Sequence, residues 1–198
     1  MLVLQYSREE TIQTFKKRSQ DDIFLIENLL SDQKCDILRD YIDNNANIKE
    51  KEFNDETNVK SYVCKEPKLD ISSSLYKEIV EPLMSELRYI FHHKYAIFFK
   101  EHEAITLRKI YGATSMHIDS VFQNKFHSSQ QPVRILSCII CLNDDYEGGE
   151  LIFPSQNRTI KLKKGQILLF PPYWTHPHYS EKLKNNTFRY TINTWLYD

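Results

Sequence analysis

The sequence predicts an α+β fold in which helices pack on a β-sandwich, with the strands concentrated in the C-terminal part. Up to about residue 100, apolar residues recur mainly at helical spacing, whereas from about residue 104 onward short β-patterned runs follow one another. All four glycines, at positions 112, 148, 149 and 165, lie in this second half, where turns separate the runs. Helices followed by a run of strands are typical of helices that cover one face of a sheet.

The N-terminal part is expected to begin with a polar helix at Ser7–Arg18 and a short apolar strand at Ile23–Ile26. Ser31 is a suitable N-cap for the next helix, because its hydroxyl can accept from a free backbone N–H of the first turn. Leu38, Tyr41 and Ile42 would then share one face of that helix.

The rest of the N-terminal part contains one irregular and one regular segment. Residues 47–60 are charged and without periodicity, and we expect them to be irregular. Leu75, Ile79, Leu83, Leu87 and Ile90 are at helical spacing and predict a long helix from about Ile71 to His92, which Pro82 would kink or divide.

The C-terminal part predicts six strands, each bounded by turn residues. They are Ala104–Ile110, Val133–Leu142, Glu150–Phe153, Thr159–Leu162, Gln166–Phe170 and Phe188–Trp195. The polar segment Ser120–Gln131 is expected to be a long loop, either a functional lid or plain surface, and its position next to His117 and Asp119 favours the lid.

Composition indicates one domain, residues 1–198, with helical support over about 1–100 and a β core over about 101–198. The net charge of −1 argues against nucleic acid and against anionic membranes as partners. We expect a cytoplasmic protein, since no signal peptide or transmembrane stretch is recognisable. Cys138 and Cys141 could be a metal or redox pair, but on a strand they face opposite sides, which favours ordinary buried thiols.

The pair His117 and Asp119 is the strongest functional signal in the chain. In an extended segment, residues two apart point the same way, so both side chains can reach one metal ion while Ile118 points away. Two histidines and one carboxylate with open positions are the ligands of non-heme Fe(II) sites. A third ligand from another strand can be distant in sequence, and Arg189 suits a carboxylate that a planar fork can grip. A surface His and Asp at a strand end is the alternative for the pair taken alone.

Several ordered motifs resemble the prolyl 4-hydroxylase-like branch of the Fe(II)/2-oxoglutarate-dependent oxygenases. They are LRKIYGATSMHID (107–119), RILSCIICLNDDYEGGELIFP (134–154), KKGQILLFPPYWTHPH (163–178) and FRYTINTW (188–195). The stretch FLIENLLSDQKCDILRDYI (24–42) is similar to the family's first strand and helix more loosely.

The resemblance implies a double-stranded β-helix, or jelly-roll, with the N-terminal helices packed on one sheet. It implies iron bound by His117, Asp119 and His178, and the distal carboxylate of 2-oxoglutarate bound by Arg189 with Thr191 beside it.

The same resemblance implies further residues of the pocket. Ser137 and Tyr111 would line the cosubstrate site, although the family's tyrosine usually stands further ahead of the first histidine. Arg108 and Trp195 would face the substrate. Cys141 departs from the pattern, because the family has an aromatic residue there.

His176 is the alternative to His178 as third ligand, since Pro177 favours an extended backbone in which both rings point the same way. The frame F-P-P-x-W-x-x-P-H favours His178, from which Arg189 follows after eleven residues, close to the family's interval.

The resemblance implies a dioxygenase that uses Fe(II), 2-oxoglutarate and O2, with ascorbate as a further cofactor, and that hydroxylates a prolyl residue of a protein or peptide. Small molecules or nucleobases are alternative substrates. A metal-dependent hydrolase or a cupin-type isomerase would have no use for Arg189 and Thr191, and a non-catalytic binding module usually loses a ligand that is present here.

Overall fold

The computed structural model describes residues 21–45, 50–52, 63–65, 68–120 and 133–198. The predicted helix Ser7–Arg18 and nearly all of the predicted loop Ser120–Gln131, with its interpretation as a lid, lie outside these residues. The division into one domain of residues 1–198 stays a prediction.

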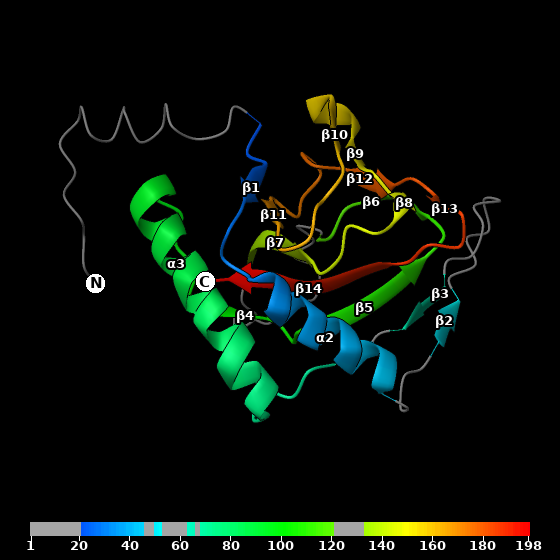
Figure 1. Cartoon of the computed structure of the whole chain (residues 1–198). Helices are drawn as coiled ribbons and strands as arrows, with labels where there is room; N and C mark the ends of the chain where they lie inside the picture. The colour runs from blue at the N-terminus through cyan, green and yellow to red at the C-terminus, as the bar shows by residue number, and fades with distance from the viewer. Residues whose placement is uncertain (1–20, 46–49, 53–62, 66–67, 121–132) are drawn as a thin grey trace.

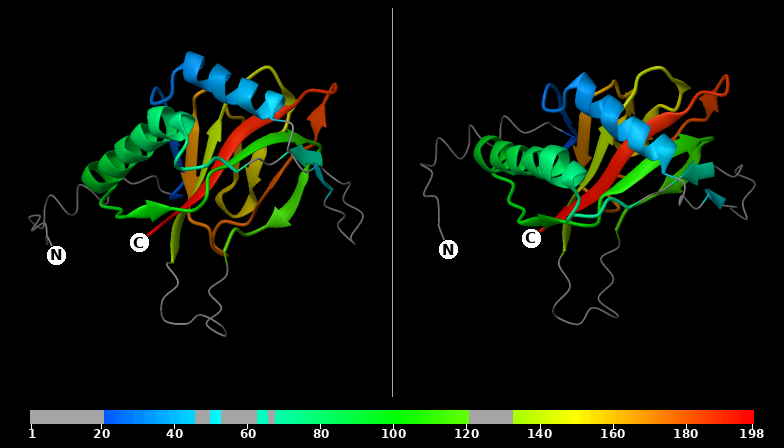
Figure 2. Two further views of the ribbon diagram at one scale, coloured as in Figure 1. Left: turned by 90° about the horizontal axis from the view of Figure 1, so that it is seen from below. Right: turned by 60° about the horizontal axis from the view of Figure 1, so that its bottom comes forward.

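Two antiparallel sheets face each other, and the helices cover the outer face of the larger one (Figures 1 and 2). The larger sheet has the order β1 (Phe24–Ile26), β11 (Ile167–Phe170), β7 (Arg134–Cys141), β14 (Arg189–Tyr197), β5 (Thr106–Tyr111), β3 (Val63–Lys65) and β2 (Glu50–Glu52), and β4 (Glu101–His102) also pairs with β14. The smaller sheet has the order β10 (Arg158–Ile160), β9 (Leu151–Phe153), β12 (His178–Ser180) and β6 (Thr114–His117). A separate pair joins β13 (Leu183–Lys184) to β8 (Glu147–Gly148).

The six predicted strands correspond to β5, β7, β9, β10, β11 and β14, and the predicted strand Ile23–Ile26 corresponds to β1. Strands β3, β4, β6, β8, β12 and β13 are not among those predicted. Each has two to four residues and no run of three apolar residues, unlike the equally short β1, β9 and β11. The expectation that residues 47–60 are irregular is wrong at β2, which pairs with β3 and extends the larger sheet.

Helix α2 (Asp32–Asn44) begins as predicted, because the Ser31 side chain accepts a hydrogen bond from the backbone N–H of Lys34 at 3.4 Å. The helix buries Cys35, Leu38 and Ile42 against the larger sheet. Asp43, near its end, accepts hydrogen bonds from the Tyr190 hydroxyl and from Lys109, so α2 is also held to β14 and β5 by polar contacts.

The predicted helix Ile71–His92 is divided into a π-helical turn, Tyr76–Val80, and helix α3 (Glu81–Tyr95). Pro82 is the second residue of α3 and has no backbone N–H to donate, at the point where the π-helical turn gives way to the α-helix. Helix α3 ends at Ala96, whose φ of 52° reverses the chain. Among the described residues, no helix is long and apolar enough to cross a membrane.

Two hydrophobic clusters lie on opposite faces of the larger sheet. The cluster under the helices combines residues of α2 and α3 with Cys138, Ile140 and Ile192, and it surrounds the fully buried ring of Phe91. The cluster between the sheets contains Cys141. The two cysteines therefore belong to opposite faces of β7, which confirms the interpretation as ordinary buried thiols.

Replacement of Phe91 by alanine should destabilise the fold by about 3–5 kcal/mol, since the ring is buried against Phe24, Tyr95 and Phe99 and leaves a cavity. Urea unfolding followed by circular dichroism measures this change. Tyr89→Ala on the exposed face of the same helix is the control, with an expected change within about 0.5 kcal/mol. Equal stabilities of the two variants would contradict the assignment of Phe91 to the core.

Candidate metal centre

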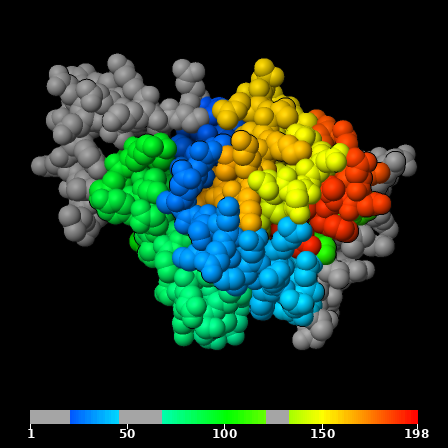
Figure 3. Space-filling view, viewed as in Figure 1, coloured from blue at the N-terminus to red at the C-terminus, as the bar shows by residue number. Residues whose placement is uncertain are grey.

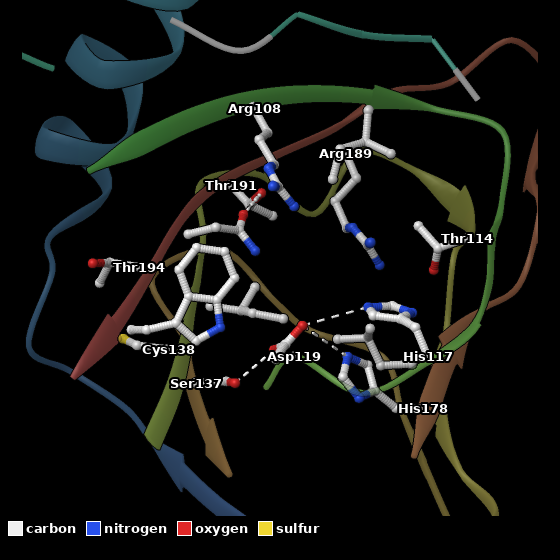
Figure 4. Close-up of a pocket in the computed structure, with 15 residues that line it drawn as sticks. Arg108, Thr114, His117, Asp119, Ser137, Cys138, His178, Arg189, Thr191 and Thr194 are labelled. Carbon is white, nitrogen blue, oxygen red and sulfur yellow. Dashed lines mark hydrogen bonds and ion pairs between the residues drawn. The ribbon is translucent and has the colours of Figure 1, made fainter. Parts of the chain in front are cut away.

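His117, Asp119 and His178 come together at one end of the smaller sheet (Figure 4). His117 ends β6 and His178 begins β12, and the two residues are direct partners across these antiparallel strands. The Asp119 Oδ1 atom lies 3.5 Å from His117 Nε2 and 4.0 Å from His178 Nε2. Two ring nitrogens and one carboxylate oxygen within 4.8 Å of one another form a set that could hold one metal ion.

Backbone carbonyls orient both imidazole rings. His117 Nδ1 donates to the carbonyl of Ser115 at 2.8 Å, and His178 Nδ1 donates to the carbonyl of His176 at 3.1 Å. A carbonyl can only accept, so each ring carries its proton on Nδ1 and presents the lone pair of Nε2 toward Asp119. Both histidines therefore have the tautomer that ligation requires.

The Asp119 carboxylate is held at its other oxygen. The Ser137 hydroxyl donates to Oδ2 at 2.5 Å, which leaves Oδ1 facing the histidines. Burial alone would raise the pKa of Asp119, but interactions with His117, His178 and Ser137 outweigh it and lower the pKa to about 2. Asp119 is therefore an anion throughout the physiological pH range.

The two histidines differ in exposure. His178 is 3% exposed, and its ring lies between Phe153, stacked at 5.3 Å, and the edge of Phe170 at 4.7 Å. Burial lowers the pKa of His178, which keeps it neutral. The side chain of His117 is 41% exposed. Burial of its ring nitrogens would lower the pKa of His117, but its interaction with Asp119 outweighs burial and the opposing charge of Arg108 and raises it. The centre is thus closed on the His178 side and accessible on the His117 side.

Arg134 is a residue that the sequence analysis did not single out, although it stands three residues before Ser137 in the R-x-x-S pattern. Its guanidinium donates to the backbone carbonyl of Asp119 at 2.6 Å and makes a double hydrogen bond with the Glu103 carboxylate. It also lies 4.0 Å above the ring of Trp195. Arg134 therefore holds both the backbone of Asp119 and the ring of Trp195 in position.

Alternate residues of β14 line one wall of the pocket in front of the three side chains. Arg189, Thr191, Asn193 and Trp195 share the face toward the smaller sheet, while Tyr190 and Ile192 between them pack under the helices. This arrangement confirms that Arg189 and Thr191 lie on one face of the strand.

Arg189 is 4% exposed and points into the pocket (Figure 4). Its Nη1 donates to the carbonyl of Gly149. Gly149 has a φ of 71°, and a Cβ there would lie 2.8 Å from the Leu183 side chain, so glycine is required at this turn. The Arg189 Nε atom is buried and makes no hydrogen bond within the part of the chain that the structure describes. A buried guanidinium with a free donor is suited to an anionic ligand such as the distal carboxylate of 2-oxoglutarate.

The structure brings most of the predicted site residues to this pocket. Ser137, Thr191, Arg108 and Trp195 all line it. The hydroxyl of Ser137 is used by Asp119, and that of Thr191 donates to Asn193 Oδ1 at 2.6 Å, so neither proton is directed at a cosubstrate.

Two other candidates lie elsewhere. Tyr111 is not among the lining residues, because Arg108 and Ile110 occupy the inner positions of β5 and the ring of Tyr111 packs against Phe188, 5.7 Å away. The His176 ring is hydrogen-bonded through Nε2 to the carbonyl of Asp21 and through Nδ1 to the Thr175 hydroxyl. It is not part of the group formed by His117, Asp119 and His178. The alternation of the strand and the turn before β12 account for these two placements.

Ser137→Ala should weaken Fe(II) binding about 10- to 100-fold, because Asp119 would lose the donor that orients it. Titration calorimetry under anaerobic conditions measures the affinity. Ser115→Ala is the matched control, since it removes a neighbouring hydroxyl but keeps the carbonyl that His117 uses. Equal affinities of the two variants would show that the Ser137 hydrogen bond does not support the centre.

Residues 107–197 match the model of the 2OG-Fe(II) oxygenase superfamily, in which 2OG is 2-oxoglutarate. No curated protein matches the sequence significantly.

Solved structures with the same fold include several prolyl hydroxylases. The viral collagen prolyl hydroxylase of Paramecium Bursaria Chlorella virus-1, in complex with 2-oxoglutarate, is 20% identical with a TM-score of 0.68, over 89% of this chain and 95% of that one. A Trichoplax adhaerens prolyl hydroxylase in complex with a hypoxia inducible factor peptide is 14% identical with a TM-score of 0.68, over 98% and 94% of the two chains. A Pseudomonas putida prolyl-4-hydroxylase is 12% identical with a TM-score of 0.66, over 93% and 97%.

These similarities confirm the predicted jelly-roll with helices on one sheet. The superfamily uses Fe(II), 2-oxoglutarate and O2, and the donor set of His117, Asp119 and His178 fits such an iron ion. Residues 107–197 are therefore similar to the 2OG-Fe(II) oxygenase superfamily, and the chain has a fold like that of these prolyl hydroxylases.

Proposed function

We propose that this protein is an Fe(II)- and 2-oxoglutarate-dependent dioxygenase that hydroxylates a prolyl residue of a protein or peptide. The observation that carries the oxygenase assignment is the convergence of His117 Nε2, Asp119 Oδ1 and His178 Nε2 in a pocket that also contains the buried guanidinium of Arg189. A metal-dependent hydrolase would need the three ligands but would have no function for a buried arginine.

His117, Asp119 and His178 would hold the iron. When bound, Fe(II) together with O2 and 2-oxoglutarate supplies the oxidising chemistry, in which the cosubstrate is converted to succinate and CO2 and one oxygen atom is transferred to a C–H bond. The protein supplies one negative charge through Asp119 and two neutral imidazoles whose tautomers are set by backbone carbonyls. Phe153 and Phe170 exclude water behind His178.

Arg189 would bind the distal carboxylate of 2-oxoglutarate. Its guanidinium is anchored at one nitrogen by the Gly149 carbonyl, which fixes the direction of the remaining donors. A planar fork of this kind pairs with a carboxylate through two parallel hydrogen bonds. Binding there would orient the cosubstrate with its other end toward the metal ligands.

A prolyl residue of a peptide is the proposed substrate because several structures that share this fold are prolyl hydroxylases, one of them in complex with a peptide. The His117 side of the centre is exposed, which would allow a peptide substrate to approach the metal site from solvent. Met116, on β6, and Trp174, shortly before β12, are 52% and 64% exposed. They give apolar surface to the two segments that carry the candidate histidine ligands.

Asp119→Ala is expected to abolish succinate formation, because it removes the only negative charge of the proposed ligand set. The assay follows conversion of labelled 2-oxoglutarate with Fe(II), O2 and a library of proline-containing peptides. Asp144→Ala, at an exposed carboxylate, should behave as the wild type. Normal turnover by the Asp119 variant would refute the assignment of the centre.

Arg189→Gln should raise the KM for 2-oxoglutarate about 30-fold or more, since removal of one member of a buried, hydrogen-bonded charge pair costs about 2–5 kcal/mol. The KM is measured at saturating Fe(II) and O2. Arg88→Gln, on the exposed face of α3, is the control. An unchanged KM in the Arg189 variant would mean that the cosubstrate binds elsewhere.

A further inference from the structure

The side chain of Asn143 takes the place of a strand partner beside Arg189. The register of β7 with β14 ends before Arg189 is reached. Beyond it, Asn143 Oδ1 accepts a hydrogen bond from the backbone N–H of Tyr190 at 2.7 Å, and Nδ2 donates to the carbonyl of Phe188 at 2.8 Å. These groups belong to the peptide bonds on either side of Arg189. One amide therefore holds the backbone of Arg189 on the β7 side, where the strand itself no longer does.

Asn143 is itself fixed in one orientation. Its side chain is buried, with 2% exposure, and Nδ2 donates a second hydrogen bond to Asp145 Oδ1 at 2.6 Å. The other oxygen of Asp145 accepts from Arg39 of helix α2 at 3.0 Å. An amide whose oxygen faces an N–H group and whose nitrogen faces two acceptors cannot be turned over without losing all three bonds.

The segment that begins with Asn143 also holds the other end of Arg189. At its far end, the carbonyl of Gly149 accepts from the Arg189 guanidinium. Residues 143–149 therefore fix both the backbone and the guanidinium of Arg189. Figure 4 shows Arg189 across the pocket from the three candidate metal ligands. The distance between the guanidinium and the metal centre is thus set by contacts with this one segment.

We propose that Asn143 is a positioning residue for cosubstrate binding and that it sets, through Arg189, the length of the 2-oxo diacid that the pocket accepts. This assignment rests on the proposed function, in which Arg189 binds the distal carboxylate of 2-oxoglutarate. A diacid held at the metal by one end and by Arg189 at the other must match the distance between them. Asn143 does not line the pocket, so its effect on the diacid is exerted through the position of Arg189.

Binding of diacids of different length tests the proposal without turnover. Titration calorimetry is performed anaerobically on the Fe(II)-loaded protein with oxaloacetate, 2-oxoglutarate and 2-oxoadipate, each longer than the last by one methylene group. Asn143→Asp keeps an acceptor for the Tyr190 N–H but places an oxygen against the Phe188 carbonyl and the Asp145 carboxylate. This variant should bind 2-oxoglutarate about fivefold or more weakly, because buried acceptors lose their donor.

The preference among the three diacids should also change. The ratio of the dissociation constant of 2-oxoadipate or of oxaloacetate to that of 2-oxoglutarate should shift by about threefold or more, because a displaced guanidinium suits a different length. The affinity for Fe(II) should stay that of the wild type, because the hydrogen bonds of the Asn143 side chain go to Asp145, Phe188 and Tyr190 rather than to the metal ligands.

Asn185→Asp is the matched control. It makes the same replacement at an exposed asparagine whose Nδ2 donates to the Glu147 carboxylate at 2.5 Å, and it should leave the affinities for all three diacids unchanged. Thermal unfolding verifies that each variant is folded. Asn143→Ser introduces no charge and is too short to bond to both peptide groups, and it is the deciding variant if Asn143→Asp does not fold.

Three results would overturn the proposal. They are an unchanged affinity for 2-oxoglutarate in the folded Asn143 variant, a loss of affinity by the same factor for all three diacids, and a loss of Fe(II) affinity of similar size. The second and third results would show that Asn143 supports the fold as a whole and not the position of Arg189. Failure of the proposed function has a different signature, because the Fe(II)-loaded wild type would then bind none of the three diacids.

Discussion

Strand β14, Arg189–Tyr197, is hydrogen-bonded to β7 on one side and to β5 on the other along most of its length. Its side chains alternate between two environments. Tyr190, Ile192 and Leu196 join the core under the helices, and the residues between them line the pocket. A shift of one residue in this register would exchange the two sets, burying Arg189 under the helices and moving Ile192 into the pocket. The hydrophobic core therefore also holds the pocket residues in place.

The ligands of the candidate metal centre are oriented by hydrogen bonds to groups outside the ligand set. The carbonyls of Ser115 and His176 set the tautomers of the two histidines, and the Ser137 hydroxyl holds one oxygen of Asp119. Arg134 joins the backbone of Asp119 to Glu103 on the segment before β5. Each ligand is thus oriented by a second group, which directs the three donor atoms toward one point.

The two ends of the pocket carry opposite charges. Asp119 gives the end near the smaller sheet a negative charge, which suits a cation, while Arg108 and Arg189 give the end near the larger sheet positive charge, which suits anions. A dianionic cosubstrate can bridge these ends.

The sequence by itself predicted the class of fold, the cap of α2, seven strands and the pair His117 and Asp119, because these features are recorded in local periodicity and spacing. The residues of β2, β3, β4, β6, β8, β12 and β13 carried no such local signal. The frame F-P-P-x-W-x-x-P-H favoured His178 without excluding His176, and the outward direction of Tyr111 did not follow from local pattern. Only the tertiary structure decided these placements, because they depend on which carbonyls and neighbouring strands each side chain meets. The pocket side of Arg108 and the role of Arg134 depend equally on pairing with residues far away in the chain.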